Sequence, residues 1–150
     1  MMEEQTETRK IEIVGFTHQG MRTACRISCA LEQAETGASV RVWCKKEELW
    51  DIPAFSQCEI HRVPKSIREW TGEHFSSCDA MIFVGATGIA VRSIAPFLVS
   101  KKTDPAVLAV DEMGHYVISL VSGHIGGANE LCQKIAGKIE VRLLLRLPRI

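Results

Sequence analysis

The sequence predicts an α/β domain whose layered sheet is mostly parallel and carries helices on both faces. The first observation is that short apolar, strand-like segments alternate with segments whose apolar residues recur at helical spacing. The second is the run DAMIFVGA (79–86), which is almost continuously apolar and is typical of a central strand buried on both faces. With 150 residues, the chain suits a single domain over residues 1–150.

The first half of the chain is divided by residues that begin or end helices. Gly37 ends a helix that we expect to begin after the turn THQG. Ser66 is a suitable N-cap for a second, shorter helix. Residues 45–64 contain two prolines, and we expect them to have little regular structure. The elements predicted in this half are a strand at 11–16, a helix at 21–36, a strand at 39–44 and a helix at 66–75.

The second half of the chain has clearer boundaries. Pro96 should bend or end the helix that follows the buried strand. The sequence Glu-Met-Gly is a short hairpin turn between two strands, so the sheet should be antiparallel there. The elements predicted in this half are a helix at 88–99, hairpin strands at 106–111 and 115–121, and a last helix with an apolar face of Ile125, Ala128, Cys132, Ile135 and Ile139.

Charge and composition exclude several classes of function. Lys+Arg and Asp+Glu number 18 each, so no net charge favours nucleic acid or an anionic membrane as partner. The chain begins with polar and acidic residues rather than a signal peptide, and no run approaches the roughly 20 apolar residues that span a bilayer. We therefore expect a cytoplasmic protein. The six cysteines show no C-x-x-C pair and no zinc-like spacing, so we expect small, mostly buried, reduced side chains.

The sequence GATG (85–88) joins the buried strand to the following helix. In sheets of this kind, ligands bind beyond the carboxyl ends of the strands, and a helix N-terminus offers free N–H groups to an anion. We therefore predict Gly85, Thr87 and Gly88 as binding residues. Arg92 joins them because it is the only charged residue between positions 80 and 100. The alternative is a tight turn permitted by the glycines, with Arg92 reaching solvent.

The sequence VSGHIGGANEL (121–131) also follows a strand and opens a helix, so it predicts a second anion-binding loop. His124 stands between glycines, and its ordinary pKa suits general acid–base work near neutral pH. A helix cap and a surface histidine are the simpler alternative. The residues predicted to bind through this loop are Ser122, Gly123, Gly126 and Gly127.

Three polar residues are predicted to support His124. Asn129 and Glu130 follow it in the last helix, where side chains lean toward the N-terminus and so toward His124. Asp111 ends a strand beside the proposed cleft, although the sequence Asp-Glu-Met-Gly also fits a turn. A solvated helix position is the simpler alternative for Glu130.

Three segments, in this order along residues 82–139, resemble the N-terminal domain of the CbiG family of cobalamin biosynthesis proteins: GATGIAVRSIAPFL, KKTDPAVLAVDEMG and VISLVSGHIGGANEL. The resemblance implies the hydrolysis of cobalt-precorrin-5A, in which the ring A lactone of the macrocycle opens and acetaldehyde is released. It also implies a tetrapyrrole-derived substrate that carries its own cobalt. We therefore expect no cofactor and no metal site in the protein.

This resemblance gives the predicted site residues their roles. Lactone hydrolysis needs an activated water and a group that stabilises the developing oxyanion. We expect His124 to be the general base and Glu130 or Asp111 to orient it. Backbone N–H groups of residues 123–127, or the Ser122 hydroxyl, would hold the oxyanion. Arg92 and the two helix N-termini would bind the carboxylates of the substrate.

The end of the chain departs from the family pattern. Family members continue into a strand resembling V-I-T-T-A-T-D and then into a C-terminal domain, which is absent here, where the sequence EVRLLLRLPRI (140–150) follows. Codons can be chosen for this tail that, when read two bases later, encode nearly that strand. We therefore hypothesise that residues from about 140 onward are read out of frame. The sequence of the coding DNA would test this hypothesis. The tail fits no core strand pattern, and on this hypothesis it should be poorly ordered. The domain would then lack a strand or borrow one by forming a homodimer.

Two other functions fit the same residues. The chain could be a non-catalytic module that binds a corrinoid or another polyanion. The predicted sheet is also Rossmann-like, so GATG could be the phosphate loop of a nucleotide-binding domain. Nucleotide binding is disfavoured, because an acidic residue about 20 positions after the loop usually binds the ribose. The nearest candidates here, Asp104 and Asp111, are not well placed for it.

Overall fold

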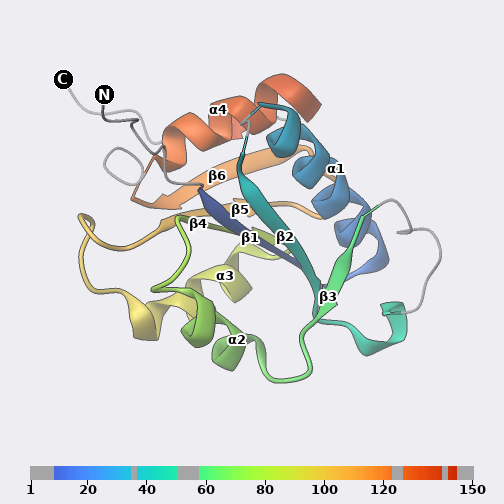
Figure 1. Ribbon diagram of the computed structural model, residues 1–150, viewed down its shortest axis with the longest axis horizontal. Coiled ribbons are helices and arrows are strands. Elements are labelled where there is room, and N and C mark those ends of the chain that lie inside the picture. The colour runs from blue at the N-terminus through green and yellow to red at the C-terminus, as the bar shows by residue number, and fades with distance from the viewer. Residues whose placement is uncertain (1–8, 35–36, 51–57, 123–126, 140–141, 145–150) are drawn as a thin grey trace, which may run out of the picture.

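The strand-like segments of the sequence come together as one sheet in the computed structural model (Figure 1). The structure describes residues 9–34, 37–50, 58–122, 127–139 and 142–144. The strands are β1 (Lys10–Gly15), β2 (Ser39–Cys44), β3 (Ile60–Arg62), β4 (Ala80–Val84), β5 (Ala106–Val110), β6 (Tyr116–Val121) and β7 (Arg142–Leu144). The α-helices are α1 (His18–Ala34), α2 (Ile67–His74), α3 (Thr87–Ile94) and α4 (Ala128–Ile139), and the 3-10 helices are η1 (Glu47–Leu49) and η3 (Ala95–Phe97).

The strands lie in the order β3-β2-β1-β4-β5-β6-β7. Strands β1 to β5 run parallel, β6 turns back antiparallel to β5, and β7 runs parallel to β6. The chain winds outward from β1 to β3, returns to β4 on the other side of β1, and winds outward again. The gap between β1 and β4 is therefore the topological switch point of a doubly wound sheet. The predicted fold class is confirmed, including the hairpin near residues 106–121.

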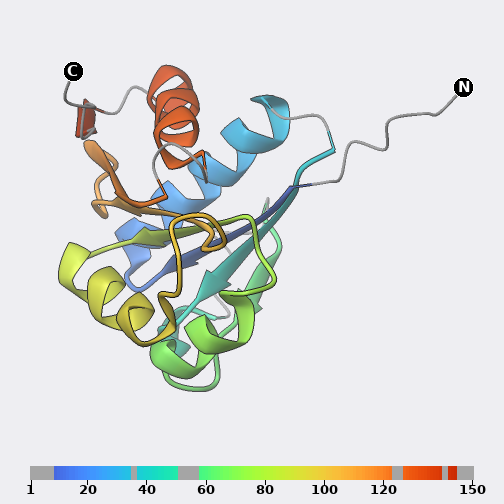
Figure 2. The ribbon, with the colours of Figure 1, turned by 90° about the vertical axis from the view of Figure 1, so that its left-hand side faces the viewer.

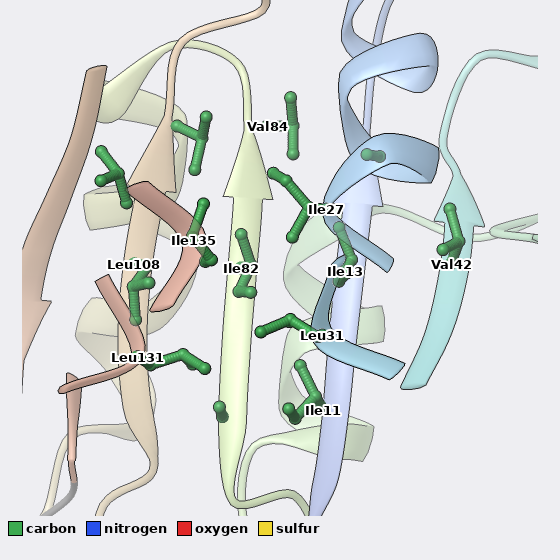
Figure 3. Close-up of a cluster of buried hydrophobic side chains, with 14 of the residues drawn as sticks. Ile11, Ile13, Ile27, Leu31, Val42, Ile82, Val84, Leu108, Leu131 and Ile135 are labelled. Carbon is green, nitrogen blue, oxygen red and sulfur yellow. The ribbon is translucent and has the colours of Figure 1, made fainter. Parts of the chain in front are cut away.

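Helices cover both faces of the sheet, with α1 and α4 on one face and α2 and α3 on the other (Figures 1 and 2). All five residues of β4 are buried, as predicted for a central strand. Ile82 belongs to the cluster under α1 and α4, whereas Phe83 belongs to the opposite cluster. In Figure 3, Ile27 and Leu31 of α1 lie close to Ile82. Burying each such large aliphatic side chain contributes about 1.5–3 kcal/mol.

Capping residues decide where the helices begin and end. The prediction that THQG is a turn before the first helix is wrong, because Thr17 caps α1: its Oγ1 accepts the backbone N–H of Gly20 at 2.9 Å. Ser66 caps α2 as predicted, and its hydroxyl accepts the N–H of Glu69 at 3.1 Å. The prediction for Pro96 is confirmed, since α3 ends at Ile94 and Pro96 lies in η3.

Two short strands differ from the sequence prediction. β3 lies in the segment 45–64, which was expected to have little regular structure. β7 lies in the tail, which was expected to fit no core strand, and it pairs with β6. Each of these strands has three residues, too few for an alternating pattern to be recognised, and pairing with an existing sheet edge supplies their hydrogen bonds.

A buried carboxylate lies on the α2 side of the sheet. Glu12, in the middle of β1, is 2% exposed. Arg41 of β2 pairs with this carboxylate and donates from Nε at 2.8 Å, and the indole N–H of Trp43 donates to it at 2.7 Å. These donors from a neighbouring strand satisfy a charge that would otherwise be costly to bury. The imidazole of His74 packs against Trp43 with ring centroids 5.0 Å apart and the ring planes tilted by 47°.

Candidate functional site

The carboxyl ends of β1, β4 and β5 meet at the switch point, and the N-termini of α1 and α3 lie there too. We call this side of the sheet the carboxyl edge and the opposite side the amino edge. The backbone N–H of Gly85, which follows β4, donates to the carbonyl of Val110 at the end of β5 at 2.8 Å. The GATG loop is thereby tied to the neighbouring strand, and its glycines lie where doubly wound sheets bind ligands.

The N-terminus of α3 has no side-chain cap. Its N-cap residue is Ala86, which makes no side-chain hydrogen bond, and its first turn contains no acidic residue. The first N–H groups of a helix have no partner within the helix, so this end carries unsatisfied donors and a partial positive charge. Thr87 and Gly88 are exposed at this end. The GATG loop therefore has the features of an anion-binding site.

Gly88 has no structural reason to be glycine. A Cβ atom built on it meets no other atom within 4 Å, and its φ lies outside the left-handed region. In contrast, a Cβ on Gly20 would lie 3.0 Å from Thr17 Oγ1 and 3.2 Å from the carbonyl oxygen of Val84. Gly20 therefore serves packing, since it lets α1 approach the end of β4. Gly88 leaves its backbone accessible from solvent, which suits close approach by a ligand.

Glu112 lies at the candidate site and was not predicted as a site residue from the sequence. Its carboxylate Oε2 accepts the hydroxyl of Thr17 at 2.9 Å, and its backbone carbonyl accepts the hydroxyl of Thr23 at 2.7 Å. Both the side chain and the backbone of this exposed residue are thus held against the start of α1. Thr17 and Glu112 are 95 positions apart, so only the topology of the sheet brings them together.

Asp111 makes a hydrogen bond within the hairpin, whereas Arg92 is exposed on α3. Asp111 Oδ1 accepts the N–H of Tyr116 at 2.6 Å, which closes the hairpin, so its carboxylate serves the turn that its sequence also suggested. Arg92 is exposed in the last turn of α3, consistent with a side chain that reaches solvent or a ligand.

The second predicted loop begins at the amino edge. Because β6 runs antiparallel to β5, its last residue Val121 pairs with Val107, near the start of β5. Ser122 follows with φ +59°, a left-handed conformation that is costly for a non-glycine residue. Its hydroxyl donates to the carbonyl of Asp104 at 3.2 Å. Gly127, at the other end of the loop, has φ +82°. Gly123, His124 and Gly126 lie outside the described residues.

The structure does not bring Asp111 to this second loop. Asp111 precedes β6 and Ser122 follows it, and the six residues of β6 span about 20 Å at 3.3 Å per residue. Glu130 and Asn129 do lie beside the loop, in the first turn of α4. The exposed carboxylate of Glu130 pairs with Lys134 Nζ at 3.3 Å, an ordinary i,i+4 pair. The GATG loop and the described ends of the second loop, Ser122 and Gly127, therefore lie at opposite edges of the sheet.

Two searches of the described part of the chain bear on cofactors and membranes. No group of three or more His, Cys, Asp or Glu side chains in those ranges is arranged to hold a metal ion. No helix within the same residues is long and apolar enough to cross a membrane.

Doubly wound α/β domains commonly bind small molecules at the switch point, and here the uncapped N-terminus of α3 lies there. Sequence comparison identifies the family. The profile described as "Cobalamin synthesis G N-terminal" matches residues 69–145, just over half of the chain and including both predicted loops. The chain belongs to this family.

Individual relatives agree with this assignment. Cobalt-precorrin-5A hydrolase of Priestia megaterium is 34% identical over 134 residues, which make up 89% of this chain and 34% of that protein. Cobalt-precorrin-5A hydrolase of Salmonella typhimurium is 55% identical over 65 residues, 43% of this chain and 18% of that protein. This chain thus spans about a third or less of the length of these curated relatives.

The fold also matches a solved structure. A cobalamin biosynthesis protein G homolog from Sulfolobus solfataricus superposes with a TM-score of 0.67 and 22% sequence identity, covering 91% of this chain and 36% of that chain. At this identity the match supports the fold.

Proposed function

We propose that the chain acts in cobalamin biosynthesis as part of a cobalt-precorrin-5A hydrolase, which opens the ring A lactone of its substrate and releases acetaldehyde. The observation that carries this proposal is the 34% identity to the Priestia megaterium hydrolase along 89% of the chain. Cobalt enters as part of the substrate, so the chemistry required of the protein is to bind carboxylates and to activate water.

The carboxyl edge suits the binding of a macrocycle that carries several carboxylates. The uncapped N-terminus of α3 offers N–H donors around Thr87 and Gly88, and Arg92 adds a positive charge on the same helix. A carboxylate arm seated on these donors would place the rest of the macrocycle over the switch point, near Glu112.

Glu112 fits the role of the group that activates water at this edge. The Thr17 hydroxyl fixes Oε2, so Oε1 has a defined direction from which it can accept a proton from water. The sequence analysis assigned the base to His124, with Glu130 beside it, at the amino edge. That assignment stays a prediction, and it makes a different residue essential for turnover.

Anaerobic incubation of the purified chain with cobalt-precorrin-5A tests the proposal, with acetaldehyde and bound corrinoid measured in the same sample. We expect acetaldehyde release. Binding without release would refute hydrolysis by this chain and leave a corrinoid-binding module. Absence of both would refute the whole proposal, provided that circular dichroism shows a folded protein.

Two variants then locate the base. Glu112→Gln keeps the size of the side chain and should abolish turnover while corrinoid remains bound. His124→Ala should leave turnover within a few-fold of the parent if the carboxyl edge performs the chemistry. The opposite pattern would refute Glu112 and support His124.

A further inference from the structure

Thr23 of α1 uses its hydroxyl outside its own helix. Threonine and serine hydroxyls within a helix commonly donate to a carbonyl of the preceding turn, as Thr71 of α2 does to the carbonyl of Ile67 at 2.7 Å. The Thr23 hydroxyl instead donates at 2.7 Å to the carbonyl of Glu112, which is 89 positions away in the sequence. Because Thr23 is only 1% exposed, a buried side chain holds the backbone of an exposed residue.

The tip of the hairpin between β5 and β6 lies directly against Thr23. A Cβ atom built on Gly114 would lie 3.2 Å from Thr23 Cγ2, and Gly114 has φ +74°. Within the tip, the N–H of Gly114 donates to the carbonyl of Asp111 at 2.9 Å, and Asp111 Oδ1 accepts the N–H of Tyr116 at 2.6 Å. The tip is therefore a closed turn with hydrogen bonds of its own, and Thr23 fixes where this turn lies on α1.

Two hydroxyls on the same helix define the direction of the Glu112 side chain. Thr23 holds its backbone carbonyl, and Thr17 holds its Oε2 at 2.9 Å. Thr17 precedes α1, whereas Thr23 lies in the second turn, so the glutamate side chain runs back along α1 toward the carboxyl edge. An exposed glutamate without such an anchor would distribute its carboxylate over many rotamers.

We propose that Thr23 is a positioning residue for Glu112. Its hydroxyl holds the glutamate backbone so that the carboxylate lies at the carboxyl edge, in the direction set by Thr17. This inference rests on the proposed function, in which Glu112 accepts a proton from the attacking water. Thr23 acts only through Glu112 in this role. Since misplacing a reacting group by about 1 Å can cost about 100-fold in rate, loss of this hydroxyl should reduce turnover.

Thr23→Val removes the hydroxyl and keeps the size and branching of the side chain. We expect kcat for acetaldehyde release, measured anaerobically with cobalt-precorrin-5A, to fall about 10- to 100-fold. KM should stay within a few-fold of the parent value, because the substrate carboxylates are bound at the N-terminus of α3 in the proposed function. Thr23→Ser retains the hydroxyl and should keep kcat within a few-fold of the parent. Parental kcat in Thr23→Val, or an equal loss in Thr23→Ser, would overturn the proposal.

Thr71 provides a matched control. It is fully buried and its hydroxyl also donates to a backbone carbonyl at 2.7 Å, but α2 lies on the other face of the sheet from α1 (Figures 1 and 2). Thr71→Val therefore removes the same kind of bond and should change Tm by a similar amount, while kcat stays at the parent value. Equal losses of kcat in the two valine variants would show that Thr23 affects stability alone, which would refute the proposal.

Amide hydrogen exchange measures the same contact without turnover. Released from α1, the hairpin tip should open more often, so the N–H groups of Gly114 and Tyr116 should exchange several-fold faster in Thr23→Val than in the parent. Thr71→Val should leave both exchange rates unchanged. Unchanged rates in Thr23→Val would show that the tip does not depend on this hydroxyl, and the inference would fail.

These measurements separate failure of the inference from failure of the proposed function. If the parent chain releases no acetaldehyde, or if Glu112→Gln retains turnover, the proposed function of the carboxyl edge is refuted and Thr23 has no base to position. If the parent is active and Glu112→Gln is inactive, parental kcat in Thr23→Val refutes the positioning role alone.

Discussion

Replacing Gly88 by alanine should stabilise the fold and weaken ligand binding at the same time. Gly88 is the second residue of α3, its φ is compatible with alanine, and a Cβ there meets nothing within 4 Å. Alanine is favoured over glycine in helices by about 0.5–1 kcal/mol. For a domain of this size, that corresponds to a rise in Tm of about 1–4 °C.

The same methyl group occupies the space through which a carboxylate would approach the backbone N–H groups of α3. Forcing one extra methyl group into a close-packed contact costs about 1–3 kcal/mol. This corresponds to about a 5- to 150-fold loss of affinity, because each 1.4 kcal/mol is a factor of ten. The assays are thermal unfolding of the free protein and anaerobic corrinoid binding followed by absorbance.

Gly137 provides the matched control. It is an exposed glycine of α4, and a Cβ on it also meets nothing within 4 Å. Gly137→Ala should raise Tm by a similar amount and leave corrinoid affinity unchanged. If Gly88→Ala binds corrinoid as tightly as the parent, the carboxyl edge is not the binding site. If it lowers Tm, the space around Gly88 is not open, and the reasoning fails at its first step.

Three other perturbations test the scaffold. Glu12→Gln leaves Arg41 and the indole N–H of Trp43 without a carboxylate, so it should reduce the free energy of unfolding by about 3 kcal/mol in urea titrations; a loss below about 1 kcal/mol would refute the importance of this pair. Gly20→Ala should cost about 1–3 kcal/mol, because its Cβ would lie 3.2 Å from the backbone oxygen of Val84, and an unchanged Tm would contradict that. Burial lowers the pKa of His74, with a smaller opposing effect from Glu12, so the folded state favours the neutral imidazole. Stability should therefore fall as pH drops below the unfolded value of about 6.5, and His74→Gln should lose that part of the pH dependence.

Long or strongly patterned elements could be predicted from the sequence, while short ones depended on tertiary context. The apolar run of β4 and the hairpin turn before β6 carry their structure locally, and both predictions are confirmed. β3 has three residues and forms because β2 offers an open edge. Thr17 looks like part of a turn until its hydroxyl is seen to accept the N–H of Gly20.

The residues of the candidate site show the same difference between local sequence signals and tertiary contacts. The GATG loop was predicted because its position after a buried strand is itself the signal. Glu112 was missed as a site residue, because its significance comes from the contact with Thr17, 95 positions away. The separation of the two loops was also missed, because Asp111 was expected beside His124, although the hairpin that causes the separation was predicted correctly. A hairpin reverses the chain, so the loop after β6 must begin at the amino edge, opposite the loop after β4.

This separation constrains how the family's sequence pattern relates to its chemistry. Both loops fall within the residues that match the family, and β6 alone places about 20 Å between the two edges of the sheet. We expect a ligand seated on the N-terminus of α3 to lie near Glu112, while Ser122 and Gly127 lie at the ends of the other loop, which begins at the amino edge. We therefore expect the two loops to perform separate tasks. Gly88→Ala should consequently lower the affinity for corrinoid. His124→Ala should instead affect the task performed at the amino edge, without an equal loss of corrinoid affinity. Equal losses of affinity in both variants would show that the two edges act on one ligand.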